Sequence, residues 1–194
     1  MKINAKRAIL EFSSIVIAVI LAMSLSEMRQ NYLNKKLAEN SFENIVLEVQ
    51  KNREDLIRDS TKISKDLAFI QQWIRDVVEK RKPEAFNAGF SFSFLNTSAM
   101  EVAEINQSLA FLSTEQNIDI AEVYATQKFY AEHGAKMFDI MGELVGQISN
   151  PDPDDLLPDV FTMRFHLRII FDTIKAYLQE SSVFMRKYAT EASD

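Results

Sequence analysis

The longest apolar run of the chain lies near its N-terminus. From residue 8 to residue 26 the only charged side chain is that of Glu11. As a helix that rises about 1.5 Å per residue, this run would be roughly 28 Å long, close to the ~30 Å hydrocarbon core of a bilayer. Glu11 would lie near one end, where a carboxylate costs less than at the midplane. The pattern predicts an N-terminal transmembrane anchor over residues 1–26.

Two other interpretations of this run stay open from the sequence. A cleaved signal peptide would share the basic start and the small residues Ala22 and Ser24, although an acid inside the apolar region does not fit one. A helix buried in a soluble oligomer would also be apolar over this length.

One face of the span carries small side chains at steps of four, at Ser14, Ala18 and Ala22. Such spacing lets two helices approach closely in lipid, but small residues are common in any transmembrane helix. Glu11 either forms a polar contact with a partner helix or pairs at the interface with a nearby base or a lipid headgroup. We interpret these four residues as a transmembrane helix contact.

A second hydrophobic pattern repeats every seven residues over a span of 36 residues, at Phe42, Val49, Leu56, Ile63, Ile70 and Val77. This pattern is typical of an amphipathic helix packed in a bundle or coiled coil. The neighbouring line contains Asn52, Asp59 and Asp66, so a plain two-stranded coiled coil is not expected. Asp59 and the Ser60 and Thr61 that follow it could also cap a local break.

Three more helices are predicted beyond Pro83, the first proline of the chain. Ser98 and Glu101 have the spacing of a capping box, and Ser113 and Gln116 offer a second cap. Prolines between the last two helices forbid continuation, and the final helix is apolar over a wide arc, as expected for a central helix. The three helices are expected over residues 98–112, 115–148 and 159–189.

The expected fold class is all-α, with an N-terminal transmembrane helix that continues into an elongated up-and-down bundle of three to four helices. No glycine or proline precedes residue 83, so no flexible linker separates anchor from bundle. The expected parts are the anchor at 1–26, a helical membrane-proximal stalk at 27–41 and a bundle domain at 42–190, with an irregular Phe-rich segment at 83–97 and a Pro/Asp loop at 149–158.

Phenylalanine and serine alternate strictly from Phe90 to Phe94, which indicates an extended segment. Either these rings plug the end of the bundle, or Phe90, Phe92 and Phe94 form an exposed apolar surface for a partner or for lipid. Both interpretations fit the sequence.

Composition excludes several classes of site. The chain has 194 residues, no cysteine, two histidines and a net charge of −6. A disulfide scaffold, a thiolate metal site and a multi-histidine metal centre are therefore excluded, and the acidic balance disfavours nucleic-acid binding. We find no nucleophile–base–acid set and no phosphate-binding glycine loop. We expect no catalytic residue, no cofactor and no metal.

One candidate ligand site remains, in the last helix. Arg164 and Arg168 lie four residues apart, on either side of His166. Two guanidinium groups on one face could clamp an anionic ligand. They could equally pair with the abundant acids of the bundle.

The segment Glu11–Ala22, followed by Ser26–Gln30, resembles the start of a family of uncharacterised bacterial single-pass membrane proteins. These begin with a glutamate–aromatic apolar span and end it with a cluster like acid–tryptophan–arginine. Residues 48–56 resemble their next helix, and 98–103 resemble a later motif. Met28 and Met100 stand where tryptophan is expected in relatives. The resemblance implies a single-pass anchor and a helical C-terminal domain, and implies nothing about chemistry.

These observations predict a membrane-anchored interaction or scaffold protein of a bacterial inner membrane. It would be an accessory subunit of a membrane complex or a homo-oligomer, and its partners would be membrane lipid and either another membrane protein or a second copy. The alternative is an extracytoplasmic sensor or ligand-binding module of four-helix type that acts through a partner.

Orientation is a testable expectation. Basic residues are equally numerous on the two sides of the span, but those before it are more closely spaced and are joined by the terminal amine. We therefore predict the N-terminus inside and the bundle in the periplasm. A C-terminal fusion to a reporter that works only in the cytoplasm should be inactive, and an active fusion would reverse the assignment.

Overall fold

The computed structural model describes residues 5–86, 90–147 and 152–188. Within these ranges all regular structure is helical, which confirms the all-α class. The elements are α1 (Ala5–Val78), α2 (Ser98–Ile105), the short 3-10 helix η1 (Ser108–Phe111), α3 (Thr114–Gln147) and α4 (Pro153–Tyr188).

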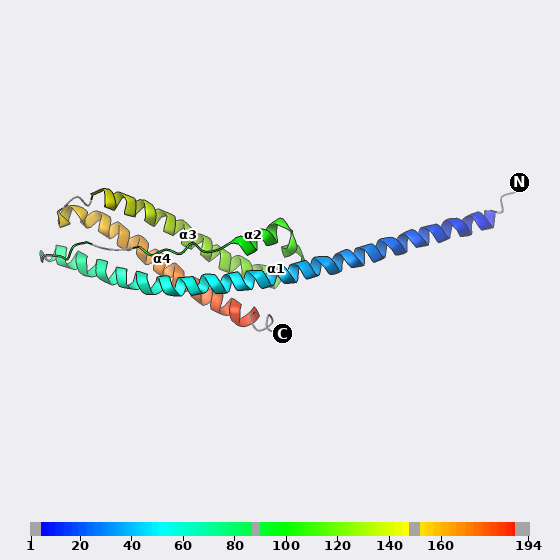
Figure 1. Cartoon of the computed structure of the whole chain (residues 1–194), viewed down its shortest axis with the longest axis horizontal. Helices are drawn as coiled ribbons and strands as arrows, with labels where there is room; N and C mark the ends of the chain where they lie inside the picture. The colour runs from blue at the N-terminus through cyan, green and yellow to red at the C-terminus, as the bar shows by residue number, and fades with distance from the viewer. Residues whose placement is uncertain (1–4, 87–89, 148–151, 189–194) are drawn as a thin grey trace.

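Helix α1 is the organising element of the chain. Its 74 residues form one rod that leaves the bundle and extends alone toward the N-terminus (Figure 1). Side chains are exposed from Leu10 to Leu33, and Ala38 is the first buried one along the described part of the helix. Beyond it, the six residues of the seven-residue repeat, from Phe42 to Val77, are all buried. The same helix is therefore apolar all round from residue 10 to residue 26, apart from Glu11 and a few serines, and amphipathic where it packs in the bundle.

No break occurs at the possible cap Asp59, because α1 continues to Val78. The helix ends instead in a hydrogen-bonded turn in which Lys80 N–H donates to Val77 O and Arg81 N–H donates to Asp76 O. Lys80 takes the left-handed conformation, with φ of 55°, that this type of C-cap needs. Asp59 does not cap a helix, because its carboxylate binds Ser93 and Tyr130.

The bundle alternates in direction, but one of its four passes is not a helix. Figure 1 shows α1 and α3 running away from the N-terminal end, with α4 returning beside both. Between α1 and α3 the chain returns as an extended segment, residues 90–97, which we call the strap. Helix α4 packs against both α1 and α3, so it is the central helix, as its wide apolar arc predicted.

Polar side chains of α1 and α3 hold the strap by its backbone. The Asn52 side chain binds Asn96 twice, accepting from its N–H at 2.9 Å and donating to its carbonyl at 2.8 Å. Gln127 of α3 donates to the same carbonyl at 2.8 Å. Asn52 and Gln127 are 1% and 3% exposed, so these bonds form away from water, where unmet polar groups are costly.

Two buried carboxylates of α1 complete this arrangement. Asp59 accepts from Ser93 N–H at 2.7 Å and from the Tyr130 hydroxyl at 3.2 Å. Glu48 accepts from Ala99 N–H at 2.8 Å and from the Tyr124 hydroxyl at 2.5 Å. Each carboxylate is therefore satisfied by a backbone donor and a tyrosine. Asn52 and Asp59, two of the polar residues that interrupt the repeat of α1, are its contacts to the strap, and Glu48 binds the start of α2.

The start of α2 differs from the prediction. The expected capping box of Ser98 and Glu101 does not form, because Ser98 Oγ donates to Asn96 and Glu101 bonds Thr97. Instead, the N–H of Ala99, which has no partner within the helix, donates to the Glu48 carboxylate, which is distant in sequence. A negative charge at this position is also favourable to the helix dipole.

Two predicted helix boundaries are wrong. The helix expected over 98–112 is divided into α2 and η1, because Gln107 takes a left-handed conformation with φ of 56°. Helix α4 begins at Pro153 and not near Asp159. Proline is well suited to a first helical position, and Pro158 is accommodated inside the helix. The Pro/Asp loop is correspondingly shorter than the expected 149–158.

The strap contacts generate a stability prediction. Asn52→Ala removes the acceptor of Asn96 N–H, one of the two donors to Asn96 O and the donor to the buried Gln127 Oε1. This loss should lower the free energy of unfolding by about 2 kcal/mol. Chemical denaturation of the full-length protein measures this. Gln50→Ala, on the exposed side of the same helix turn, should change it by no more than about 0.5 kcal/mol. Equal effects would mean that the Asn52 bonds add no stability.

Candidate membrane anchor and binding pockets

The part of α1 outside the bundle is long and apolar enough to cross a membrane. None of its most apolar 18-residue window is buried by the rest of the protein, so an aqueous environment would leave this surface uncovered. Ser14, Ala18 and Ala22 are exposed along one face, and Ser14 Oγ donates to the Glu11 carbonyl one turn earlier. The structure places these residues on the helix but shows no partner for the face among the described residues.

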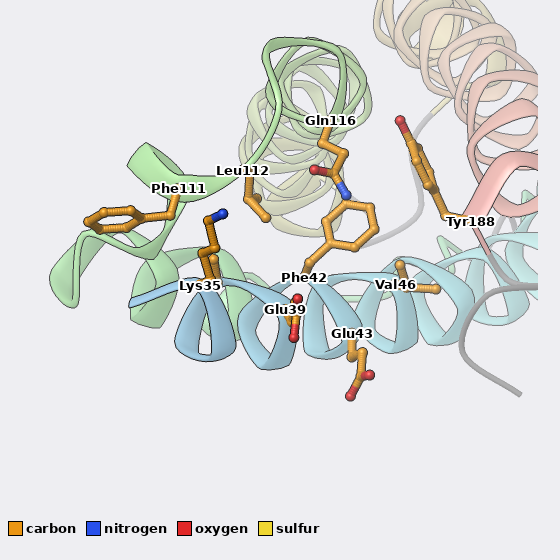
Figure 2. Close-up of a pocket in the computed structure, with 10 residues that line it drawn as sticks. Lys35, Glu39, Phe42, Glu43, Val46, Phe111, Leu112, Gln116 and Tyr188 are labelled. Atoms are coloured by element: carbon orange, nitrogen blue, oxygen red, sulfur yellow. The ribbon is translucent and has the colours of Figure 1, made fainter. Parts of the chain in front are cut away.

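A pocket of about 340 Å³ lies where α1 enters the bundle (Figure 2). Its buried floor comes from Ala38, Phe42 and Val46 of α1 and from Tyr188 at the end of α4. Other lining side chains come from the start of α3, from the turn before it and from charged positions of α1: Lys35, Glu39, Glu43, Phe111, Leu112 and Gln116.

The wall formed by Tyr188 is fixed by several contacts. Its ring meets that of Phe42 edge-on, with centroids 4.9 Å apart, and its hydroxyl donates to Asp119 at 2.6 Å. Lys187 bridges Asp119 at 2.6 Å and Glu115 at 2.5 Å. Although burial alone would raise it, the bonds from Lys187 and Tyr188 hold the pKa of Asp119 below its ordinary value. Asp119 is therefore a charged acceptor that ties α4 to α3.

The phenylalanines of the strap lie along the side of α3. Phe92 is half-buried and stacks on Tyr130 with centroids 4.6 Å apart. Gly134 makes room for this ring, since a Cβ there would lie 1.9 Å from Phe92 Cε2. Phe90 is half-buried as well, whereas Phe94 is 82% exposed and stacks on Phe138. A partner surface at these rings stays a prediction that would depend mainly on Phe94.

The three residues of the predicted anionic-ligand site are divided between two places. Arg164 and Arg168 line a shallow pocket of about 310 Å³ together with Phe165. The Arg168 guanidinium already bonds Asp172 at 2.9 Å, and Arg164 lies over the Phe161 ring. A ligand at this pocket would therefore compete with Asp172 for Arg168.

His166 lies against the other histidine of the chain. The ring centroids of His133 in α3 and His166 in α4 are 6.1 Å apart. The Nδ1 atoms of both are buried and have no hydrogen-bond partner in the part of the chain that the structure describes. Burial, followed by the charges of Lys136 and His166, lowers the pKa of His133, and Glu132 opposes this shift. This pairing could not be predicted from the sequence, because the two residues are 33 positions apart.

No group of three or more histidine, aspartate or glutamate side chains that could hold a metal ion occurs among the described residues.

Like the histidine pair, the pocket at the entrance of α1 was not predicted from the sequence. In the sequence, the residues of its floor look like ordinary core residues. Only the packing of the helices shows that neighbouring side chains leave a space beside them. The strap contacts, by contrast, had a signal in the polar residues at core spacing in α1.

Comparison with known proteins identifies no relative: no family model, curated protein or solved structure matches this chain.

The histidine pair predicts a pH dependence of stability. A base with a lowered folded-state pKa stabilises the fold fully above its unfolded value, about 6.5, and loses this contribution as the pH falls below it. The melting temperature of the full-length protein in detergent should therefore fall between pH 7.5 and 5.5. In His133→Gln this fall should be smaller. An identical fall in the variant would assign the acid sensitivity to other groups.

Proposed function

We propose that this chain is a single-pass membrane protein of a bacterial inner membrane, with its bundle in the periplasm, that acts by holding the bundle against a membrane partner. It would be an accessory subunit of a membrane complex or a homo-oligomer, without catalysis of its own. The observation that carries this proposal is the continuity of α1. Its exposed apolar span and the amphipathic stretch that packs in the bundle form one helix.

An uninterrupted helix supports a positioning role. A flexible linker would let a tethered domain move over a wide volume, whereas a helix without glycine or proline transmits position and direction. Ala38, where burial begins, follows Ser26, the end of the span, by twelve positions. At about 1.5 Å per residue, the bundle would start roughly 18 Å beyond the hydrocarbon core. This height would be the same in every copy.

The other two interpretations of the apolar run fit the structure less directly. Cleavage after the run would leave residues 27–37 as a helix that projects from the bundle with no apolar span to carry. The run is not buried within this chain, so the interpretation as a buried helix would need other copies to cover it. The proposed family of single-pass membrane proteins, from the resemblance of Glu11–Ala22 and Ser26–Gln30, supports the anchor as well.

Within the membrane, the candidate contact is the face of Ser14, Ala18 and Ala22 with Glu11 nearby. Small side chains let backbones approach, so that packing can drive association in lipid, where the hydrophobic effect does not act between helices. An acid within a span is costly and usually serves a contact. The partner would be another membrane helix or a second copy of this one.

A second candidate function is a ligand-binding or sensor module that acts through such a partner. It is favoured by the 340 Å³ pocket at the point where α1 enters the bundle. A ligand there would contact the helix that leads into the membrane, as well as α3 and α4. Binding could thus change how the anchor meets its partner.

The partner can be identified by isolating the full-length protein from its own membranes in mild detergent and weighing the particles by native mass spectrometry. A defined mass that includes a second polypeptide would establish an accessory subunit. A species of this chain alone would establish a homo-oligomer. Only monomers, at a concentration comparable with that in the membrane, would contradict both forms of the proposal.

A substitution series tests the interface itself. Ala18→Leu adds bulk to the small-residue face and should shift at least half of the complex to free chains at the same concentration, while circular dichroism and melting of the bundle stay unchanged. Glu11→Gln tests the polar contact separately. Val16→Leu adds bulk on the opposite side of the helix and is the matched control. If Ala18→Leu and Val16→Leu leave the complex equally intact, the contact lies on another surface.

A further inference from the structure

The pocket at the entrance of α1 has an apolar interior and unused hydrogen-bond donors at one side. Gln116 defines the first donor. Its Oε1 accepts from Ser113 N–H at 2.9 Å, in a capping box that also joins Gln116 N–H to Ser113 Oγ. The amide nitrogen is therefore the free end of this side chain, and Figure 2 shows it directed at the Phe42 ring, toward the pocket.

Lys35 provides the second donor and the positive charge. It is exposed, lines the pocket, and has no hydrogen-bond or ion-pair partner in the described part of the chain. Figure 2 shows its ammonium group turned toward Leu112 and away from the axis of α1. A head group that accepts hydrogen bonds could therefore bind at this side of the mouth while it remains in contact with water.

Two carboxylates limit the charge of that head group. Glu39 lies one helical turn beyond Lys35 and lines the pocket, as does Glu43, whose carboxylate points outward in Figure 2. A doubly charged phosphate monoester would meet one ammonium against these two acids. A single carboxylate, bound to the ammonium of Lys35 and the amide of Gln116, meets less repulsion.

The interior specifies the rest of the ligand. Phe42, Val46 and Tyr188 are buried, and they form a floor without an inward-facing charge. Because Tyr188 donates its hydroxyl to Asp119, the face of its ring and not its polar end is left for the pocket. The volume of about 340 Å³ is at the lower end for ligand pockets. It suits one alkyl chain and not the two chains of a phospholipid.

The position of the pocket suits a ligand supplied by a bilayer. In the anchored orientation Lys35 follows the end of the span by nine residues, or roughly 14 Å along the helix. The headgroup layer accounts for about 5–7 Å of this distance. A fatty acid leaving the outer surface of the bilayer would meet the mouth of the pocket within about one further headgroup thickness.

We propose that this pocket binds a single-chain fatty acid, with its carboxylate at Lys35 and Gln116 and its alkyl chain against Phe42, Val46 and Tyr188. The proposal goes beyond the role of a membrane partner and does not require it. Where the second candidate function applies, it names the ligand class.

Equilibrium dialysis of radiolabelled laurate tests the proposal, with the full-length protein in phosphatidylcholine nanodiscs and empty nanodiscs to subtract partition into lipid. We expect saturable binding of about one laurate per chain. Lys35→Gln should weaken binding by about tenfold or more, as expected for loss of a charge-assisted hydrogen bond. Lys36→Gln, which makes the same change of charge at the next exposed residue, should bind as the wild type does.

Two further arms make the result decisive. Leu112→Trp should fill the pocket and abolish binding, and melting of the bundle verifies that this variant folds. Unlabelled dodecylamine, with the same chain and a positive head, should fail to displace laurate. No saturable binding above empty nanodiscs would overturn the proposal. Equal loss in Lys35→Gln and Lys36→Gln, or displacement by dodecylamine, would overturn the assigned head-group contact. The native mass of the complex is measured independently, so failure here leaves the proposed partner role in place.

Discussion

The whole architecture depends on one helix with two different surfaces: an exposed apolar stretch that is long enough to cross a membrane and an amphipathic stretch that packs in the bundle. In a hydrocarbon environment every backbone polar group needs an internal partner, which a helix provides. In the bundle the same backbone continues, but only one side of it is covered. The change occurs near Ala38, where exposure of every side chain gives way to a buried stripe. No glycine or proline lies between these parts to favour a break. The position of the bundle is therefore coupled to that of the apolar span.

The second constraint is the buried polar chemistry of α1. A helix with Glu48, Asn52 and Asp59 on its buried side could not pack against an apolar partner, since each group would lose its hydrogen bonds to water. An extended backbone provides the donors and acceptors that a helix keeps for itself. The strap therefore occupies the place of a fourth helix, and tyrosines of α3 supply the remaining donors. Asn52 and Asp59 also fix the register of the strap, because a shifted strap would leave buried groups unpaired.

The pocket follows from these two constraints together. Near Ala38, α1 continues beyond the ends of the other elements, so its apolar stripe outlasts the helices that cover it. Leu112, Gln116 at the start of α3 and Tyr188 at the end of α4 line the side of the pocket opposite α1. The gap lies on the helix that also forms the apolar span. The apolar span, the bundle and the pocket consequently meet on the same element, where a ligand or a partner would have most effect on the whole molecule.

The sequence by itself determined the helical class, the apolar span, the lack of a flexible linker after it and the six buried residues from Phe42 to Val77. These features arise from local periodicity and from the absence of glycine and proline, so neighbouring residues suffice to specify them. The sequence also held a partial signal of the strap, in the polar residues at core spacing. Only the tertiary structure decided their partners, the cap that Glu48 gives to α2, the meeting of His133 with His166, and the pocket beside Lys35. Each of these joins residues far apart in the chain, and such contacts depend on how the packed elements lie against one another.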